Sequence, residues 1–335
     1  MAGRDFEVSA YDLQSLNMLV GLKWTGKSHL AKSLLLGLIK HGGGALVFDI
    51  NDEYSSLHLG KDRQPRKEYK DKVQALAPGV NLKFPLKAMG ADVFLNFMEA
   101  VGVSDTSLAA LSDKVQEIGE ENLTLSELRT AIRSVETRIR GALERRLKML
   151  EDTKLIDDKA QASVLEDLLK QLDQGNALII NLKGKTKIAM RTTVQVVLSK
   201  VTRLLDEGVL APMFLFAEEA HMYAERADLE DLVTRMRHLG AWQFYMTNTP
   251  TSLPELVVRQ TDNIFCFHLS LPDDIRYLSP ASGMDDQTLA KIVKALPPRQ
   301  YLAVGRVTED YPFILKTREL DVITAGETRL RFTKP

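Results

Sequence analysis

The 335-residue sequence predicts an α/β protein with one open, mostly parallel sheet and an all-helical insertion. Short apolar segments alternate with helical patterns in the first hundred residues and again after residue 174. The apolar segments are almost continuously hydrophobic, as parallel strands covered on both faces are. From about 104 to 174, long helical patterns interrupt this alternation. The resulting division is 1–103, the first part of the core; 104–174, the helical insertion; and 175–335, the second part.

The first part of the core contains a strand, a glycine-containing turn and a helix in direct succession. Gly42, Gly43 and Gly44 end that helix. The elements expected here are strands at 16–20 and 45–50, a short strand at 81–84, and helices at 28–39 and 91–101.

Five further strands are expected in the second part of the core. A helix over 189–205 separates the first two of them. The strands are predicted at 177–182, 213–217, 243–247, 263–267 and 301–304. We therefore expect one α/β domain with a helical excursion.

The helical insertion contains a capping box, in which Thr124 is followed three residues later by Glu127. Apolar residues then recur at steps of three and four, which predicts two to four helices. One face is rich in arginine and is either solvated or a partner surface: Arg129, Arg133, Arg138, Arg140, Arg145 and Arg146.

The composition excludes several classes of protein. A single cysteine, Cys266, excludes a disulfide framework and multi-cysteine metal sites. No segment reaches the roughly 18 apolar residues of a membrane span, and the N-terminus has no apolar signal core. We expect a cytoplasmic protein. The net charge of -1 does not exclude nucleic acid, because a local group of basic residues can be balanced elsewhere.

The strongest motif is GLKWTGKS, a complete G-x-x-x-x-G-K-S between a predicted strand and a predicted helix. Its glycines let backbone N–H groups and the helix N-terminus face a phosphate chain. Lys27 is expected to reach the β- and γ-phosphates, and Ser28 to bind magnesium. The alternative, a glycine turn with an exposed lysine, does not explain the flanking elements. The predicted nucleotide-binding residues are Gly21, Leu22, Lys23, Trp24, Thr25, Gly26, Lys27, Ser28 and His29.

A second motif, MFLFAEEAH, is an apolar strand that ends in two carboxylates. Glu218 is at the position of an acid that holds magnesium, directly or through water. Glu219 is suited to polarise the water that attacks the γ-phosphate. Adjacent acids of this kind favour ATP hydrolysis over phosphate transfer to a metabolite.

Other polar residues are candidates to surround the γ-phosphate. Asn248 follows the strand at 243–247 and is suited to sense the phosphate or position the water. Arg235 and Arg237 precede that strand and are either solvated or supplied to a neighbouring subunit's site. Asp49, near the end of the strand at 45–50, and Glu53, just after it, are further candidates, and capping of the loop is an equal interpretation.

In this order, the motifs resemble the HerA/FtsK superfamily of ring-forming DNA-translocating ATPases, and its HerA branch most. The resemblance rests on GLKWTGKS, FDINDEY, FLFAEEAH, the segment RHLGAWQFYMTNTP and the closing region around KALPPRQYLAVGRV. It implies a RecA-like P-loop NTPase core, with ATP and Mg²⁺ as cofactors. The sequence departs from the family at Asn248, usually glutamine, and at Lys23 and Trp24, usually small. Since few residues precede Met18, we do not expect the N-terminal β-barrel found in many members of the family.

Carried over to this sequence, the resemblance implies that Lys27, Glu219 and Asn248 are catalytic. It makes Arg237, and with it Arg235, the arginine supplied in trans. The expected function is a homohexameric motor that moves double-stranded DNA. Its candidate DNA contacts are Lys183, Lys185, Lys187 and Arg191. The alternative is an ATP-dependent assembly platform for an effector protein such as a nuclease, with little translocation.

Overall fold

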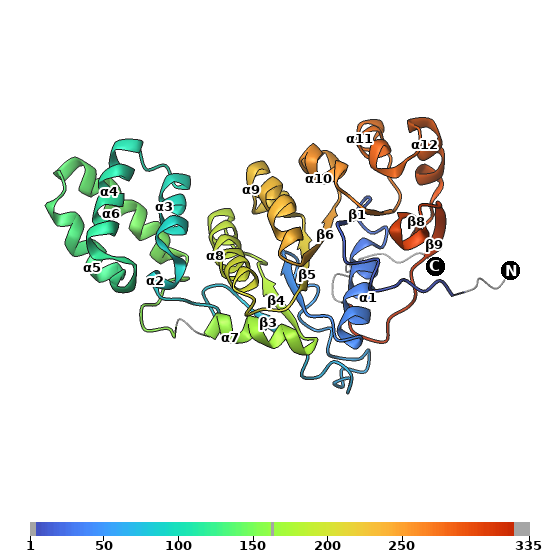
Figure 1. Ribbon diagram of the computed structural model, residues 1–335, viewed down its shortest axis with the longest axis horizontal. Coiled ribbons are helices and arrows are strands. Elements are labelled where there is room, and N and C mark those ends of the chain that lie inside the picture. Colours follow the sequence, from blue (N-terminus) through green and yellow to red (C-terminus); the bar gives the residue numbers. More distant parts are fainter. Residues whose placement is uncertain (1–4, 162–163, 325–335) are drawn as a thin grey trace, which may run out of the picture. The chain divides into compact units, whose positions relative to one another are not determined.

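The computed structural model describes residues 5–161 and 164–324. In this part of the chain, the strands form one sheet in the order β3-β4-β2-β5-β6-β1-β7-β8-β9 (Figure 1). Strands β1, β2, β4, β5, β6 and β7 are parallel to their neighbours in that group, and β8 and β9 are antiparallel. The strands are β1 (Asn17–Val20), β2 (Ala45–Asp49), β3 (Val73–Leu76), β4 (Ala177–Asn181), β5 (Met213–Glu218), β6 (Ala241–Thr247), β7 (Asn263–Cys266), β8 (Gln300–Gly305) and β9 (Phe313–Lys316). The predicted mostly parallel α/β fold is confirmed.

The chain divides into two compact units. The first holds the sheet and comprises the described residues up to 75, 170–183, and those from 205 onwards. The second comprises 76–169 and 184–204 and is helical. The helical unit begins earlier in the chain than the insertion predicted at 104–174 and also includes residues 184–204. The domain boundaries drawn from the sequence remain a prediction.

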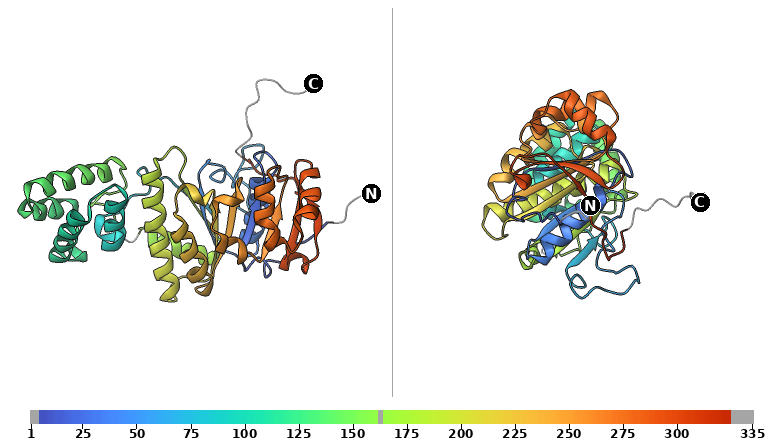
Figure 2. Two further views of the ribbon diagram at one scale, coloured as in Figure 1. Left: turned by 90° about the horizontal axis from the view of Figure 1, so that it is seen from above. Right: turned by 90° about the vertical axis from the view of Figure 1, so that its right-hand side faces the viewer.

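The helices of the first unit pack on both faces of the sheet. Helix α1 (Lys27–Lys40) covers one face, and α9 (Arg226–Asp231) and α10 (Glu255–Arg259) cover the other (Figures 1 and 2). Crossovers between parallel strands are right-handed. The step from β1 to β2 runs in one direction along the strand order and the step from β5 to β6 in the other, so their helices lie on opposite faces. At the antiparallel end follow α11 (Pro272–Ser282) and α12 (Asp286–Ala295).

The strands of the sheet are buried because both faces are covered. Strands β1, β2 and β5 have no exposed residue. Phe216 and Phe244, on neighbouring strands, stack with ring centroids 4.3 Å apart. Full burial explains the continuous apolar segments in the sequence.

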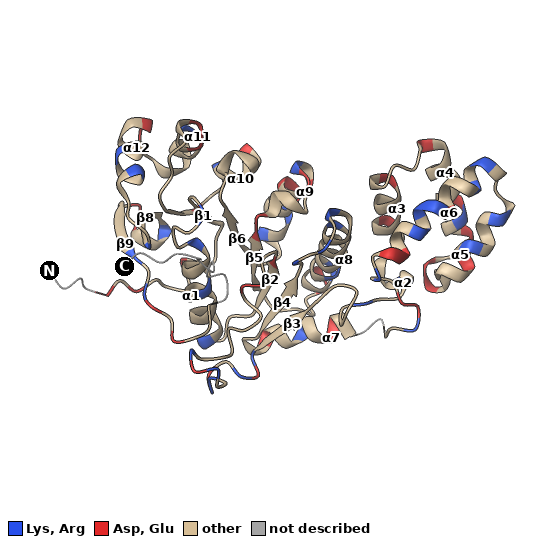
Figure 3. Cartoon of the chain, turned by 180° about the vertical axis from the view of Figure 1, so that it is seen from behind, with Lys and Arg blue, Asp and Glu red and all other residues tan. Residues whose placement is uncertain are grey.

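The second unit has its own hydrophobic core. Thr124 caps one helix as predicted, accepting a hydrogen bond from the N–H of Glu127 at 3.1 Å. Some arginines of the insertion have partners within the unit, as Arg129 has in Glu151 at 2.8 Å. Figure 3 shows basic residues along α6. The helices are α2 (Leu86–Met89), α3 (Ala91–Ala100), α4 (Asp105–Ile118), α5 (Leu125–Ala131), α6 (Thr137–Asp152), α7 (Val164–Lys170), which ends in the first unit, and α8 (Lys187–Asp206).

The sequence prediction differs from the fold at three short segments. The strand expected at 81–84 is wrong: Leu82 and Phe84 are buried but form only isolated bridges. Strands β3 and β9 were not predicted, because both are edge strands with mostly exposed or half-buried side chains and lack a buried strand's pattern. Among the described residues, no helix has both the length and the apolar character needed to cross a membrane.

Candidate nucleotide-binding site

The glycine-rich loop of GLKWTGKS follows β1 at the carboxyl edge of the sheet and leads into α1. Gly26 has φ +118° at the N-cap of α1, a conformation that side chains rarely adopt. At Gly21, with φ +147°, a Cβ would lie 2.6 Å from the Cβ of Phe267. The first turn of α1 contains no acidic residue, so its N-terminus is open electrostatically to an anion.

Lys27 lies at the centre of the loop and is buried. Its ammonium group donates to the carbonyl oxygens of Gly21 at 2.6 Å and Leu22 at 2.9 Å, and to Oδ1 of Asn248 at 2.7 Å. Burial lowers the pKa of Lys27 to about 8, against the opposing effect of the Glu219 and Glu218 carboxylates. The nearby carbonyls and carboxylates hold the amine where phosphate oxygens would meet it.

Strand order places Asn248 between the two halves of the site. Strand β6 lies between β1, which precedes the phosphate loop, and β5, which carries the two acids. Asn248 follows β6, so its side chain accepts from Lys27 and donates through Nδ2 to Glu219. The predicted meeting of these three residues around one point is therefore present in the structure.

Glu219 is fixed by its backbone and by its neighbours. Its φ of +45° turns the chain at the end of β5, and its N–H donates to the carbonyl of Met246 at 2.7 Å. The carboxylate accepts from Thr247 Oγ1 at 2.9 Å and from the N–H of Asn248 at 3.0 Å. His221 Nδ1 lies 3.6 Å from Glu219 Oε2 and 3.1 Å from Ser252 Oγ, which places His221 beside the carboxylate.

Glu218 has the features of a metal-binding carboxylate. It is 4% exposed, and its Oε2 has no hydrogen-bond partner among the described residues. Burial, and then the charges of Asp49 and Glu53, raise the pKa of Glu218 to about 8. A buried, unpaired oxygen surrounded by other acids fits a divalent cation, which would supply the missing ligand and offset the negative charge.

Two acids at the end of β2 and in the loop after it, Asp49 and Glu53, have separate structural roles. Asp49 accepts from the N–H groups of Asn51, Glu53 and Tyr54 at 3.0–3.1 Å and so caps the loop, one of the two interpretations left open by the sequence. Glu53 instead pairs with Lys32 at 2.7 Å, where both side chains are largely buried.

A cavity of about 1060 Å³ joins these groups. It is large enough for a nucleotide, since ligand pockets commonly measure about 300–1,000 Å³. Its basic residues come mainly from the phosphate loop and α1, and its acids from the ends of β2 and β5. The lining residues are Lys23, Trp24, Gly26, Lys27, Ser28, His29, Lys32, Asn51, Asp52, Glu53, Lys183, Glu218, Glu219, Met246, Asn248, Arg299 and Thr324.

Trp24 gives a direct optical test of nucleotide binding at this cavity. Its side chain is 78% exposed, and Trp242 is the only other tryptophan in the sequence. ATP bound beside Trp24 should shield the indole from water, so we expect a blue shift of the intrinsic emission on titration with ATP. Trp24→Phe should abolish this shift, whereas Trp242→Phe should preserve it. A shift that persists in Trp24→Phe would contradict this assignment.

The structure does not bring Arg235 and Arg237 to this cavity. Both precede β6 and so lie toward the amino edge of the parallel strands, where Arg237 pairs with Asp262 at 3.1 Å and Arg235 with Asp231 at 3.3 Å. Strand β6, seven residues at ~3.3 Å each and so about 20 Å long, lies in the chain between the segment with Arg237 and Asn248. Neither arginine completes the site of its own chain.

The four basic residues proposed to bind DNA have different surroundings. Lys183 lines the nucleotide cavity, with its amine 3.8 Å from Asp52. Lys185 is half-buried, and Lys187 is exposed at the start of α8. Arg191 is half-buried on the same helix. Lys183 is therefore placed to contact the nucleotide.

Sequence reasoning missed Lys32 and Arg299 as cavity residues. Lys32 is one turn of α1 beyond Ser28, so helical spacing was a usable signal. Arg299 comes from the segment before β8, and no local pattern indicates that this segment returns to the phosphate loop.

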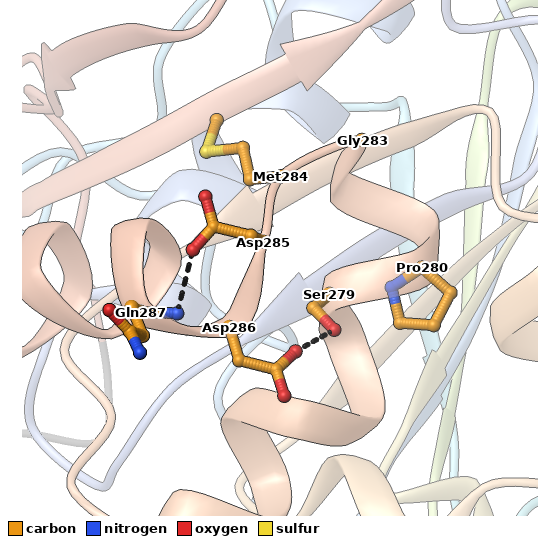
Figure 4. A pocket seen from close by; sticks show the side chains of 7 residues that line it. All are labelled: Ser279, Pro280, Gly283, Met284, Asp285, Asp286 and Gln287. Atoms are coloured by element: carbon orange, nitrogen blue, oxygen red, sulfur yellow. Dashed lines mark hydrogen bonds between the residues drawn. The ribbon is translucent and has the colours of Figure 1, made fainter.

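A separate hollow of about 610 Å³ lies between α11 and α12 (Figure 4). Its acids already have structural partners. Asp285 caps α12 through the N–H groups of Gln287 and Thr288, both at 3.0 Å. Asp286 accepts from Ser279 Oγ at 2.5 Å. These contacts account for the two carboxylates without a ligand.

The fold and the site together define a P-loop nucleotide-binding ATPase. A family model described as "Helicase HerA, central domain" matches residues 25–201, so the chain belongs to this family. No curated protein sequence matches significantly. The predicted resemblance to HerA is thereby confirmed, and the chain is an ATP hydrolase of this class.

Solved structures agree with the fold. VirB4 of Thermoanaerobacter pseudethanolicus has 15% identity and a TM-score of 0.66, over 91% of this chain and 89% of that chain. The bacterial conjugative coupling protein TrwB, in its unbound form, has 14% identity and a TM-score of 0.64, over 95% and 88%. TrwB in complex with the ATP analogue ADPNP has 14% identity and a TM-score of 0.65, over 97% of this chain and 91% of that chain. At these identities, the similarity is one of fold.

Proposed function

We propose that this chain is a ring-forming ATPase that hydrolyses ATP between subunits to move double-stranded DNA. The observation that supports it best is the hydrogen-bonded set Lys27–Asn248–Glu219 in a HerA-family core. Such a set joins phosphate binding to water activation, as a nucleotide-driven motor requires. A small-molecule kinase has no need for a carboxylate placed beside the phosphate sensor.

In this proposal, Lys27 binds the β- and γ-phosphates, with the N-terminus of α1 adding N–H donors. Glu219 holds the attacking water and accepts its proton, and Thr247 and Asn248 orient the carboxylate. Ser28 and Glu218 are the residues that would hold Mg²⁺. The ion would offset phosphate charge and the acidic cluster around Glu218.

Arg237 is proposed to complete the site of the neighbouring subunit. Arg237 does not line the cavity of its own chain, and it precedes β6, a strand about 20 Å long whose other end leads to Asn248, which argues against a role in cis. Its ion pair with Asp262 is partly exposed, and such pairs contribute only about 0–1 kcal/mol, so a developing phosphate charge can compete for the guanidinium. Arg235 is a second arginine on the same segment.

DNA binding is proposed through the backbone, because a motor must accept any sequence. Lys185 and Lys187 are the best candidates, since they do not line the nucleotide cavity, whereas Lys183 does. Arg191, one helical turn beyond Lys187, completes the basic segment.

Linear duplex DNA should therefore stimulate ATP hydrolysis, with an affinity that falls steeply as salt rises. In the double variant Lys185→Ala/Lys187→Ala, we expect weaker DNA binding. The log–log salt slope should shrink by about 0.9 for each DNA phosphate that is no longer neutralised. The measurement is DNA affinity and ATPase rate across a salt series.

The matched control is Lys61→Ala/Lys67→Ala, which removes two exposed lysines from a loop outside the cavity. It should leave DNA affinity unchanged. A wild-type ring whose ATPase rate does not respond to DNA would contradict translocation and favour the alternative, an assembly platform for an effector such as a nuclease. Particle images with an ATP analogue and DNA would give the ring size.

A further inference from the structure

Arg299 joins the segment before β8 to the phosphate loop, although about 270 residues separate them in the chain. The N–H of Arg299 donates to the carbonyl of Thr25 at 2.7 Å, and its own carbonyl accepts from the N–H of Thr317 at 2.9 Å. The Cα of Arg299 lies 3.2 Å from where a Cβ on Gly26 would stand. The backbone of Arg299 is therefore held directly against the loop that surrounds the phosphates.

This backbone has a conformation that does not favour arginine. Its φ is +67°, in the left-handed region, where glycine or asparagine is preferred and other residues are uncommon. The side chain is 48% exposed, so it adds little to the hydrophobic core. Local folding requirements thus favour glycine at position 299, and an unfavourable residue that lines a ligand cavity points to function.

Arg299 and His29 line the same nucleotide cavity. The positive charge of the Arg299 guanidinium group is one of the influences that lower the pKa of His29, after burial. Its nearest acidic partner is Glu319, at 3.4 Å, whose side chain is 77% exposed. An exposed pair of this kind is weak and can be exchanged for a phosphate oxygen. Lys27, by contrast, lies beside Asn248 and Glu219.

We propose that Arg299 is a nucleotide-binding residue, whose guanidinium group contacts the α- or β-phosphate oxygens of the nucleotide bound to its own chain. The inference deepens the proposed function, since it rests on ATP binding in this cavity. Arg299 adds affinity for the phosphates common to ATP and ADP, whereas Lys27 and Asn248 contact the γ-phosphate. It is thus distinct from the arginine supplied by a neighbouring subunit.

Arg299→Gly is the decisive variant, because glycine suits φ +67° and only the side chain is removed. Without DNA, ATP and ADP should both bind about 10- to 100-fold more weakly, as expected for loss of a charge-assisted hydrogen bond. KM for ATP should rise while kcat at saturation stays near the wild-type value. Arg299→Lys should recover part of the affinity. The Tm without nucleotide should not fall.

Arg63→Gly is a matched control, since Arg63 has φ +63°, is exposed and lies outside the cavity. It should bind ATP and ADP like the wild type. Unchanged affinities in Arg299→Gly would overturn the proposal, as would a loss confined to ATP, which would indicate a γ-phosphate contact. Because binding is measured without DNA, failure of the motor hypothesis appears separately, in the DNA-stimulated assay.

Discussion

Replacement of Glu219 by glutamine should lower kcat for ATP hydrolysis by about 100- to 10,000-fold and leave the affinity for ATP nearly unchanged. The amide is isosteric and can still accept the hydrogen bond from the N–H of Asn248 at 3.0 Å. It cannot accept a proton from water. Single-turnover hydrolysis and equilibrium ATP binding, measured on the same preparation, separate the two effects.

Thr247→Val is an informative companion to this variant. It removes the hydroxyl that donates to Glu219 Oε2 at 2.9 Å but keeps the carboxylate. We expect a smaller loss of kcat, because the base is present but less well oriented. Appreciable hydrolysis in Glu219→Gln would show that another group activates the water.

Arg237→Ala should reduce ATP hydrolysis by about 1,000-fold or more, the usual worth of an arginine supplied to the transition state. The variant should still bind ATP, since Arg237 is remote from the cavity of its own chain. The decisive experiment mixes Arg237→Ala subunits with Glu219→Gln subunits. Each variant alone should be almost inactive, yet some interfaces of a mixed ring would combine an intact Glu219 with an intact Arg237.

Random mixing in equal amounts should restore roughly a quarter of the interfaces and therefore measurable activity. Arg235→Ala, mixed in the same way, measures the contribution of the neighbouring arginine. Complete inactivity of the mixture, despite ring formation, would exclude a trans role for Arg237. The ion pair with Asp262 would then be its main function.

Sequence alone predicted the mostly parallel sheet and indicated candidate residues for both halves of the site, because these depend on local chemistry. Gly26 and Lys27 are fixed by the need to wrap a phosphate chain between a strand and a helix. Glu218 and Glu219 are marked by a buried strand that ends in acids. Asn248 was indicated by its position directly after another buried strand, β6.

What could not be predicted depends on contacts between distant segments. The position of Arg299 against Thr25 arises only when the chain returns to the phosphate loop after α12. Edge strand β9 has exposed Phe313 and Ile314, so it shows no burial pattern. The expected strand at 81–84 failed because buried apolar residues can fill a core without pairing in a sheet.

The two ends of strand β6 lead to two different ATP sites in the proposed ring. Its carboxyl end leads to Asn248, the proposed sensor of its own subunit's nucleotide, and its amino end follows the segment with Arg237. In the proposed ring, β6 therefore connects two successive ATP sites, the site of its own subunit and the site that Arg237 completes. In that ring, a displacement of Asn248 on loss of the γ-phosphate would act on the same strand whose other end follows the segment with Arg237.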